Sequence, residues 1–268
     1  MSFTIALCQM KVTESKNSNI DNARKMISDA AGKGAQLVVL PEMWNCPYSN
    51  QYFTEYSEPE GGDTYAFLSE AAKTHQIYLI GGSIPEMNNG RVYNTSYSFD
   101  RKGVLIGKHQ KAHLFDIDVK GGIRFMESET LMAGTQSTVI DTEFGKIGVA
   151  ICFDVRFPEL FRKMTLEGAK LHVLPAAFNM TTGPAHWELS MRARALDNQV
   201  YFAACSPARD ISGTYVAFGH SCVVTPWGDV CGKTDHRESI VLAEVDFDYV
   251  DSIREQLPLL KARRPELY

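Results

Sequence analysis

Three residues with complementary reactive groups follow predicted strands at separate points of the 268-residue chain: Glu42, Lys111 and Cys152. In α/β sheets the ligand site lies beyond the carboxyl ends of the strands, so we expect these three groups to converge. A cysteine nucleophile needs a base for its proton and donors for the oxyanion that forms. Glu42 can act as the base and Lys111 as an oxyanion donor, with the amide N–H of Phe153 as a second donor. The pattern predicts covalent catalysis.

Each of these residues also has a common structural explanation. Free cysteines are among the most buried residue types, and Glu and Lys are mostly solvated surface residues. Glu127, in the long segment between Lys111 and Cys152, either orients the lysine or is a simple surface charge. The surroundings of Cys152 favour a reactive thiol: a buried strand over 146–151 precedes it, and a helix predicted from Pro158 follows. The positive end of that helix is expected to favour the thiolate.

The composition excludes several classes of function. A net charge of -5 and a single short basic cluster at 261–264 argue against a nucleic-acid partner. No apolar run approaches the length that crosses a bilayer, so no membrane partner is expected. Six cysteines without C-x-x-C spacing or the density of a disulfide scaffold predict a reducing, cytoplasmic setting. His109 and His113 are four residues apart but lack a third ligand, so no metal site is predicted.

The elements around the reactive residues alternate between helix and strand. Helices are predicted over 19–31, 64–75, 158–167 and 186–197, and Asn89-Gly90 predicts a hairpin. Residues 112–138 are expected to be a long irregular segment, which is more often functional than filler. No change of composition marks a linker, so one domain over residues 1–268 is predicted. Its C-terminal segment, about 249–268, is a candidate subunit contact.

The chain contains an internal echo. Residues 34–45 align without gaps with residues 168–179, matching at Gly, Ala, Leu, Val, Leu, Pro and Asn. Each segment is predicted to follow a strand and a helix, so two α-β halves stacked into one layered sandwich explain the match. Ala176 then occupies the position of Glu42 in the second half. A shared βαβ pattern without deeper symmetry explains part of the match equally well.

Three motifs resemble those of the nitrilase superfamily of carbon-nitrogen hydrolases, in the same order and spacing: Leu40-Pro41-Glu42, Lys111-Ala-His-Leu-Phe115 and Ile151-Cys152-Phe-Asp-Val-Arg-Phe-Pro-Glu159. The resemblance covers essentially the whole chain. It is strongest to the omega-amidase branch, through residues 113–118, 177–188 and 206–210. True nitrilases resemble the chain less, because Phe-Asp follows Cys152 where they have Trp-Glu.

The resemblance implies a four-layer αββα sandwich, a homodimer or larger assembly, and no cofactor. It implies Glu42 as general base, Lys111 as oxyanion stabiliser, Cys152 as nucleophile and Glu127 as an accessory glutamate. The implied substrates are terminal amides of α-keto dicarboxylic acids, such as α-ketoglutaramate and α-ketosuccinamate, hydrolysed through a thioester. Such a substrate carries a carboxylate that needs a cation or N–H donors. The candidates for this contact, by position only, are Tyr48, Arg156, Thr181 and Thr182.

Two alternatives remain open at this point. A related amide or carbamoyl hydrolase would keep Glu42, Lys111 and Cys152 and change only the pocket walls. A non-catalytic binding protein could use the same scaffold, since fold alone does not determine function. Retention of all three reactive groups argues against the second alternative.

Overall fold

Apolar runs of the sequence form the inner strands of two β-sheets, in a computed structural model that describes residues 2–120, 124–213 and 215–267. The first sheet has the order β15-β1-β2-β3-β5-β4, with β6 paired to β5. Its strands are β1 (Ser2–Gln9), β2 (Leu37–Val39), β3 (Tyr78–Ile80), β4 (Ile84–Asn88), β5 (Arg91–Phe99), β6 (Leu105–Gln110) and β15 (Ser239–Asp246). The second has the order β14-β13-β12-β11-β10-β9. Its strands are β9 (Thr138–Thr142), β10 (Gly145–Val149), β11 (Leu171–Pro175), β12 (Tyr201–Cys205), β13 (Cys222–Val224) and β14 (Val230–Lys233).

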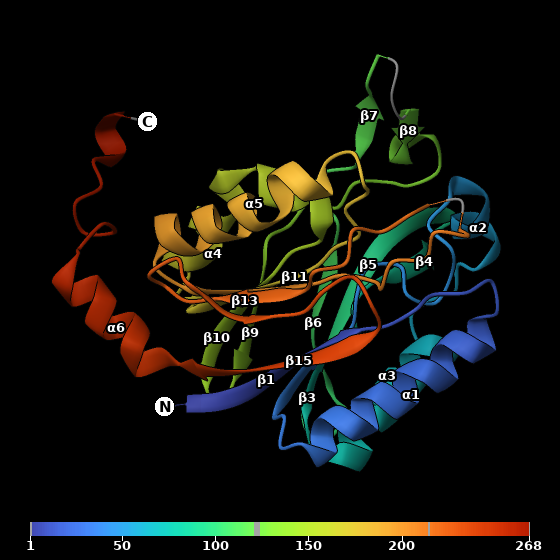
Figure 1. Cartoon of the computed structure of the whole chain (residues 1–268), viewed down its shortest axis with the longest axis horizontal. Helices are drawn as coiled ribbons and strands as arrows, with labels where there is room; N and C mark the ends of the chain where they lie inside the picture. Colours follow the sequence, from blue (N-terminus) through green and yellow to red (C-terminus); the bar gives the residue numbers. More distant parts are fainter. Residues whose placement is uncertain (1, 121–123, 214, 268) are drawn as a thin grey trace.

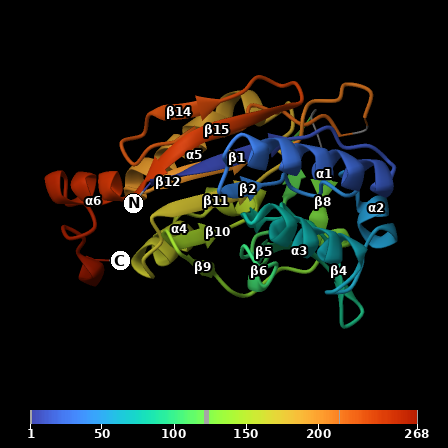
Figure 2. The same ribbon diagram turned by 90° about the horizontal axis from the view of Figure 1, so that it is seen from below.

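The two sheets lie face to face between two helical layers (Figures 1 and 2). Helices α1 (Lys16–Gly32) and α3 (Asp63–His75) pack on the outer face of the first sheet. Helices α4 (Pro158–Leu166) and α5 (Gly183–Asn198) pack on the outer face of the second. Gln76 and Gln199 end α3 and α5 in the left-handed conformation, a common way to stop a helix. The predicted four-layer αββα sandwich is therefore confirmed.

Three apolar clusters hold the layers together. The cluster between the sheets contains residues from both, such as Leu7, Val39, Val149 and Val173. The second cluster lies under α1 and α3, and the third under α4 and α5. Strands β2, β3, β11 and β12 are buried along their whole length. Parallel strands covered by helices on one side and a sheet on the other show this continuous apolar pattern.

The two sheets repeat one pattern of strand pairing, which confirms the internal pseudo-symmetry. Along β15-β1-β2-β3-β5-β4 the pairs run antiparallel, parallel, parallel, antiparallel and antiparallel. Along β9-β10-β11-β12-β13-β14 they run in the same sequence. The echoed segments 34–45 and 168–179 contain the equivalent central strands β2 and β11. The two segments meet, because the Ala177 amide donates a hydrogen bond to Glu42 Oε2 at 2.8 Å.

One expectation about local structure was wrong, and another was confirmed with an added turn. The segment 112–138 is not irregular throughout, because β7 (Asp116–Asp118) pairs with β8 (Arg124–Met126) and a 3₁₀ turn follows at Glu127–Glu129. The helix predicted from Pro158 is confirmed as α4, but a 3₁₀ helix, Cys152–Arg156, which the sequence analysis did not predict, precedes it. Cys152 therefore begins a tight turn instead of lying at the N-terminus of α4.

The remaining elements lie at the edges of the layers. Helix α2 (Asn50–Glu55) is short, and α6 (Phe247–Gln256) lies beside the sandwich, followed by a short 3₁₀ turn at Pro265–Leu267. Both views place α6 and the chain end to one side of the four layers (Figures 1 and 2). Among the residues described, no helix is both long and apolar enough to cross a bilayer.

Candidate active site

Lys111 joins two carboxylates in the interior of the protein. Its side chain is fully buried just beyond the end of β6, and its Nζ lies 2.9 Å from Glu42 Oε1 and 2.9 Å from a carboxylate oxygen of Glu127. Both glutamates are also buried. A buried ammonium shared by two buried carboxylates is an arrangement in which loss of any member leaves an uncompensated charge.

Backbone and side-chain donors fix the two carboxylates in place. Asn94 Nδ2 donates to Glu42 Oε1 at 2.8 Å, and the amide of Ala177 donates to Glu42 Oε2 at 2.8 Å. The Phe115 amide donates to Glu127 Oε2 at 2.7 Å. The Tyr48 hydroxyl donates to Glu127 Oε1 at 2.6 Å and lies 3.3 Å from Glu42 Oε1. Hydrogen bonds from the backbone and from side chains thus hold both carboxylates in place.

Cys152 lies against this cluster. Its thiol is within hydrogen-bonding reach of Glu42, and the side chain is buried. The residue adopts φ 45°, in the left-handed region that non-glycine residues rarely occupy. Such a conformation costs on the order of 1–3 kcal/mol and persists only where the surroundings enforce it. The turn therefore holds the thiol in a set position beside Glu42.

The electrostatics favour a neutral thiol next to a base. Burial, together with the charge of Glu42, holds the pKa of the Cys152 thiol well above its usual value, against the opposing charge of Lys111. The expected preformed thiolate is therefore a wrong prediction, since Cys152 is buried in the 3₁₀ turn. Burial raises the pKa of the Glu42 carboxyl; the Lys111 charge opposes this shift and the Glu127 charge reinforces it.

The lysine remains charged in this environment. Burial alone would lower the pKa of Lys111, but the charges of Glu127 and Glu42 outweigh it and hold that pKa above the usual value. A permanently cationic donor suits an oxyanion site, and a carboxylate whose pKa is raised above its usual value suits proton transfer.

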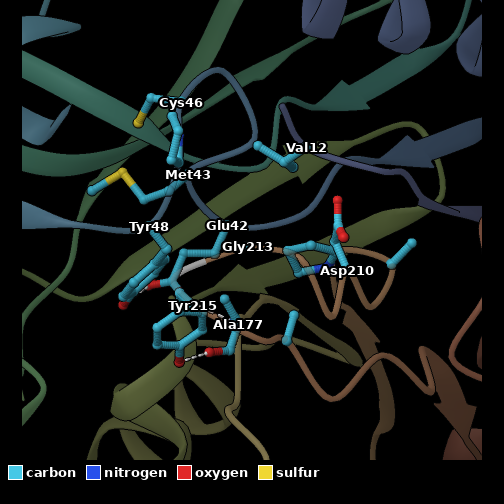
Figure 3. A pocket seen from close by; sticks show the side chains of 13 residues that line it. Val12, Glu42, Met43, Cys46, Tyr48, Ala177, Asp210, Gly213 and Tyr215 are labelled. Atoms are coloured by element: carbon cyan, nitrogen blue, oxygen red, sulfur yellow. Dashed lines mark hydrogen bonds between the residues drawn. The ribbon is translucent and has the colours of Figure 1, made fainter. Parts of the chain in front are cut away.

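Two pockets reach the cluster from different sides. The smaller lies next to Cys152 and has a volume of about 200 Å³, including space open to solvent. It is lined by Phe115, Cys152, Phe153, Arg156, Ala177, Phe178, Thr182 and Tyr215. The larger, of about 540 Å³ on the same basis, reaches Glu42 and Tyr48 (Figure 3). Ala177 and Tyr215 line both pockets, and the Tyr215 hydroxyl donates to the carbonyl oxygen of Ala177. A small molecule can thus meet the thiol from one side and the carboxylate from the other.

Comparisons with known proteins identify the family. The carbon-nitrogen hydrolase family matches residues 4–255. The omega-amidase NIT2 of Xenopus tropicalis is 52% identical over 99% of this chain and 96% of its own length. The chain belongs to the carbon-nitrogen hydrolase family. The chloroplastic omega-amidase of Arabidopsis thaliana is 52% identical over 99% of this chain and 73% of its own length.

A solved structure agrees with this assignment. Nit3 of Saccharomyces cerevisiae, a member of branch 10 of the nitrilase superfamily, superposes with a TM-score of 0.91 at 42% identity, covering 98% of this chain and 97% of its own. The resemblance to the nitrilase superfamily is thereby confirmed. This carbon-nitrogen hydrolase is an amidohydrolase that acts on bonds other than peptide bonds.

The hydrolase brings most of the sequence-predicted site residues together. Glu42, Lys111, Glu127 and Cys152 form one cluster, as described above. Phe153, Arg156 and Thr182 line the pocket beside the thiol. Thr181 is exposed and lies outside the residues that line either pocket. Tyr48 faces the two glutamates, so its hydroxyl is already used as a donor within the cluster.

Other contacts of the hydrolase were missed from the sequence. Asn94 and the Ala177 amide both bind Glu42, and Tyr215 forms a wall between the pockets. One signal for Asn94 was available: residues 94–96 are three consecutive polar residues inside a strand, and all three are fully buried. Polar groups are rarely buried without partners, so such a run points to a hydrogen-bonded site.

Proposed function

We propose that the protein hydrolyses the terminal amide of small α-keto dicarboxylic acid monoamides, such as α-ketoglutaramate and α-ketosuccinamate, to the acid and ammonia. The observation that carries the proposal is the position of Cys152, between the cluster of Glu42, Lys111 and Glu127 and a small pocket that is also lined by Arg156. The names of relatives that match over nearly the whole chain, the omega-amidases of frog and plant, support the choice of substrate.

The first half of the reaction forms a thioester and releases ammonia. Cys152 gives its proton to Glu42 as its sulfur attacks the amide carbonyl, and the oxyanion is stabilised by the Lys111 ammonium and the Phe153 amide. The carbon-nitrogen bond then breaks as Glu42 returns the proton to the leaving nitrogen. The raised pKa of Glu42 suits both transfers, because it makes the carboxylate a stronger base toward the thiol than an ordinary glutamate.

The second half of the reaction hydrolyses the thioester. A water molecule loses a proton to Glu42 and attacks the thioester carbonyl, and the departing sulfur takes that proton back. We propose that this water reaches Glu42 through the larger pocket, because that pocket is lined by Glu42 and not by Cys152. Glu127 and Tyr48 hold Lys111 and Glu42 in place during both halves.

Arg156 is the proposed partner of the substrate carboxylate. Its half-buried guanidinium lies over the rings of Phe153 and Phe178, with its carbon 5.6 Å and 5.3 Å from the ring centroids. One of its nitrogens is 3.1 Å from His186 Nδ1. A guanidinium held flat by two aromatic rings can form two parallel hydrogen bonds with a carboxylate. Thr182 lines the same pocket and can add a hydroxyl donor.

The experiment that tests this function measures ammonia release by wild type and Cys152→Ala. The substrates are α-ketoglutaramate, α-ketosuccinamate, glutamine, an N-carbamoyl amino acid and a simple nitrile. We expect turnover of the keto-amides alone, abolished in the variant. If another substrate is preferred and Cys152 is still essential, the proposed substrate is wrong and the proposed chemistry stands. Ammonia release that survives Cys152→Ala would overturn the mechanism.

We also propose that the chain acts as one catalytic domain in a homodimer or larger assembly, to which its C-terminal segment contributes. After α6 the chain continues beside the sandwich, and Leu259 and Leu267 expose 37% and 65% of their surface. Light scattering should give a dimer or larger for the full chain and a smaller mass after truncation behind Gln256. An unchanged mass would contradict the role of the segment. The six free thiols support a reducing compartment such as the cytoplasm.

A further inference from the structure

Asp154 is a fully buried carboxylate outside the catalytic cluster, two residues after Cys152. Each of its oxygens accepts two hydrogen bonds. Oδ2 accepts from the Ile151 amide at 3.0 Å and from His109 Nε2 at 3.0 Å. Oδ1 accepts from the His113 amide at 2.9 Å and from His113 Nδ1 at 2.8 Å. No proton transfer in the reaction uses this group.

The two histidines flank Lys111 at equal distances in sequence. His109 lies in β6 two residues before the lysine, and His113 follows two residues after it. Lys111 itself lies just beyond the end of β6. Asp154 therefore connects the turn that carries Cys152 with both sides of the segment that carries Lys111.

Further contacts hold the histidines. His109 Nδ1 lies 3.0 Å from Thr138 Oγ1 in β9, which ties the ring to the second sheet. The His113 ring stacks on Phe157, with the ring centroids 3.6 Å apart and the planes 9° from parallel. Each ring therefore presents a fixed nitrogen to Asp154.

Asp154 also closes the turn around the nucleophile. Its amide donates to the Ile151 carbonyl oxygen at 3.0 Å, while its carboxylate accepts from the Ile151 amide. Cys152 lies between these two reciprocal bonds with its φ of 45°. Because that conformation is unfavourable for cysteine, the surroundings must impose it, and the Asp154 carboxylate is one of the groups that do so.

We propose that Asp154, held by His109 and His113, is a positioning residue that fixes the Cys152 sulfur relative to the Lys111 ammonium. The inference rests on the proposed roles of Cys152 and Lys111. An attacking sulfur and an oxyanion donor must address the same carbonyl group, so their separation determines how well the tetrahedral intermediate is held. A displacement of about 1 Å in such a site can reduce the rate by about 100-fold.

Asp154→Asn is the decisive change because it preserves shape and alters hydrogen bonding. Both carboxylate oxygens face two N–H donors, so the amide nitrogen of asparagine faces two donors in either orientation. We expect kcat to fall by about 100-fold with KM within about 3-fold of wild type. The rate at which iodoacetamide alkylates Cys152 in Asp154→Asn should fall together with kcat.

Glu58→Gln is the matched control. Glu58 is another buried carboxylate, which accepts from the Thr64 amide at 2.7 Å and pairs with Lys16 at 3.0 Å, outside the cluster. We expect Glu58→Gln to lower the melting temperature and leave kcat unchanged. If Asp154→Asn behaves in the same way, with normal kcat below its melting temperature, Asp154 has only a structural role and the proposal is wrong.

Amide replacements of the histidines test the hydrogen bonds themselves. The Nε2 of glutamine can replace His109 Nε2, and the Nδ2 of asparagine can replace His113 Nδ1. We expect His109→Gln and His113→Asn to retain most of kcat, and His109→Leu and His113→Leu to lose it as Asp154→Asn does. Equal activity of the amide and leucine variants would overturn the proposal. This comparison can be made even if Asp154→Asn does not fold.

The same series separates this proposal from the proposed function. All variants are assayed with the best amide of the wild type, beside Cys152→Ala. Activity that survives Cys152→Ala would overturn the nucleophile and with it the positioning role. Loss in Cys152→Ala combined with normal kcat in folded Asp154→Asn would overturn the positioning role alone.

Discussion

Replacing Arg156 by methionine tests how the protein selects substrates with a carboxylate. Methionine keeps an apolar stem between Phe153 and Phe178 and removes the guanidinium. A hydrogen bond to a charged group contributes about 1.5–3 kcal/mol. Because Arg156 is only half-buried, we take about 2 kcal/mol, which corresponds to a factor of about 30 in kcat/KM.

The assay compares an acid with a neutral amide of the same length. Ammonia release from α-ketoglutaramate and from pentanamide gives kcat/KM for wild type and for Arg156→Met. We expect a loss of about 30-fold for the acid and less than about 3-fold for pentanamide. Arg156→Lys should fall between wild type and Arg156→Met, since a lysine keeps the charge without the planar pair of donors.

Two results would refute this reasoning. An equal loss for both substrates would mean that Arg156 supports the pocket walls through Phe153 and Phe178 and does not recognise charge. An unchanged kcat/KM for both would mean that the carboxylate binds elsewhere, and the Thr182 side of the pocket would then be the next region to test.

Four further predictions follow from the site and the core. Lys111→Met should lower kcat by at least about 100-fold in ammonia release, because it removes an oxyanion donor; near-normal kcat would exclude that role. Glu127→Gln should move the acid limb of kcat/KM to lower pH, because the Glu127 charge raises the pKa of Glu42; a limb that moves upward contradicts this. Burial lowers the pKa of His172 to about 3. The neutral histidine therefore contributes fully to the free energy of unfolding above about pH 6.5. This contribution is lost as the pH falls toward 3, and the loss is at most about 5 kcal/mol. His172→Gln should therefore flatten the acid dependence of urea unfolding, and an unchanged slope would argue against it. Ala217→Leu narrows the larger pocket, so thioester hydrolysis should slow more than its formation, and rapid-quench assays should detect a burst of ammonia that wild type lacks.

The sequence was informative wherever the signal was local. Glu42 and Cys152 each follow a short apolar run and Lys111 follows a predicted strand, and the rule that strand ends converge was enough to predict that they meet. The hairpin at Asn89-Gly90 and helix α4 were predicted for the same reason, because a turn dipeptide and an N-terminal proline act on their immediate neighbours.

Contacts between distant segments could not be predicted in this way. The bonds from Asn94 and Ala177 to Glu42 join residues 52 and 135 positions apart. The expected thiolate was wrong for a related reason: the pKa of Cys152 depends on burial by segments far along the chain, whereas the sequence argument considered only the helix that follows.

The pseudo-symmetry explains why the echoed segments differ at one position. Segments 34–45 and 168–179 both pass through Leu-Pro at the end of a central strand, and the first then has Glu42 where the second has Ala176. The next residue, Ala177, donates its amide to Glu42 at 2.8 Å. A second carboxylate at this place would face the first without a cation of its own, since Lys111 is already shared with Glu127. One half therefore supplies the carboxylate, the other supplies the backbone donor and Cys152, and the site exists only where the two halves meet.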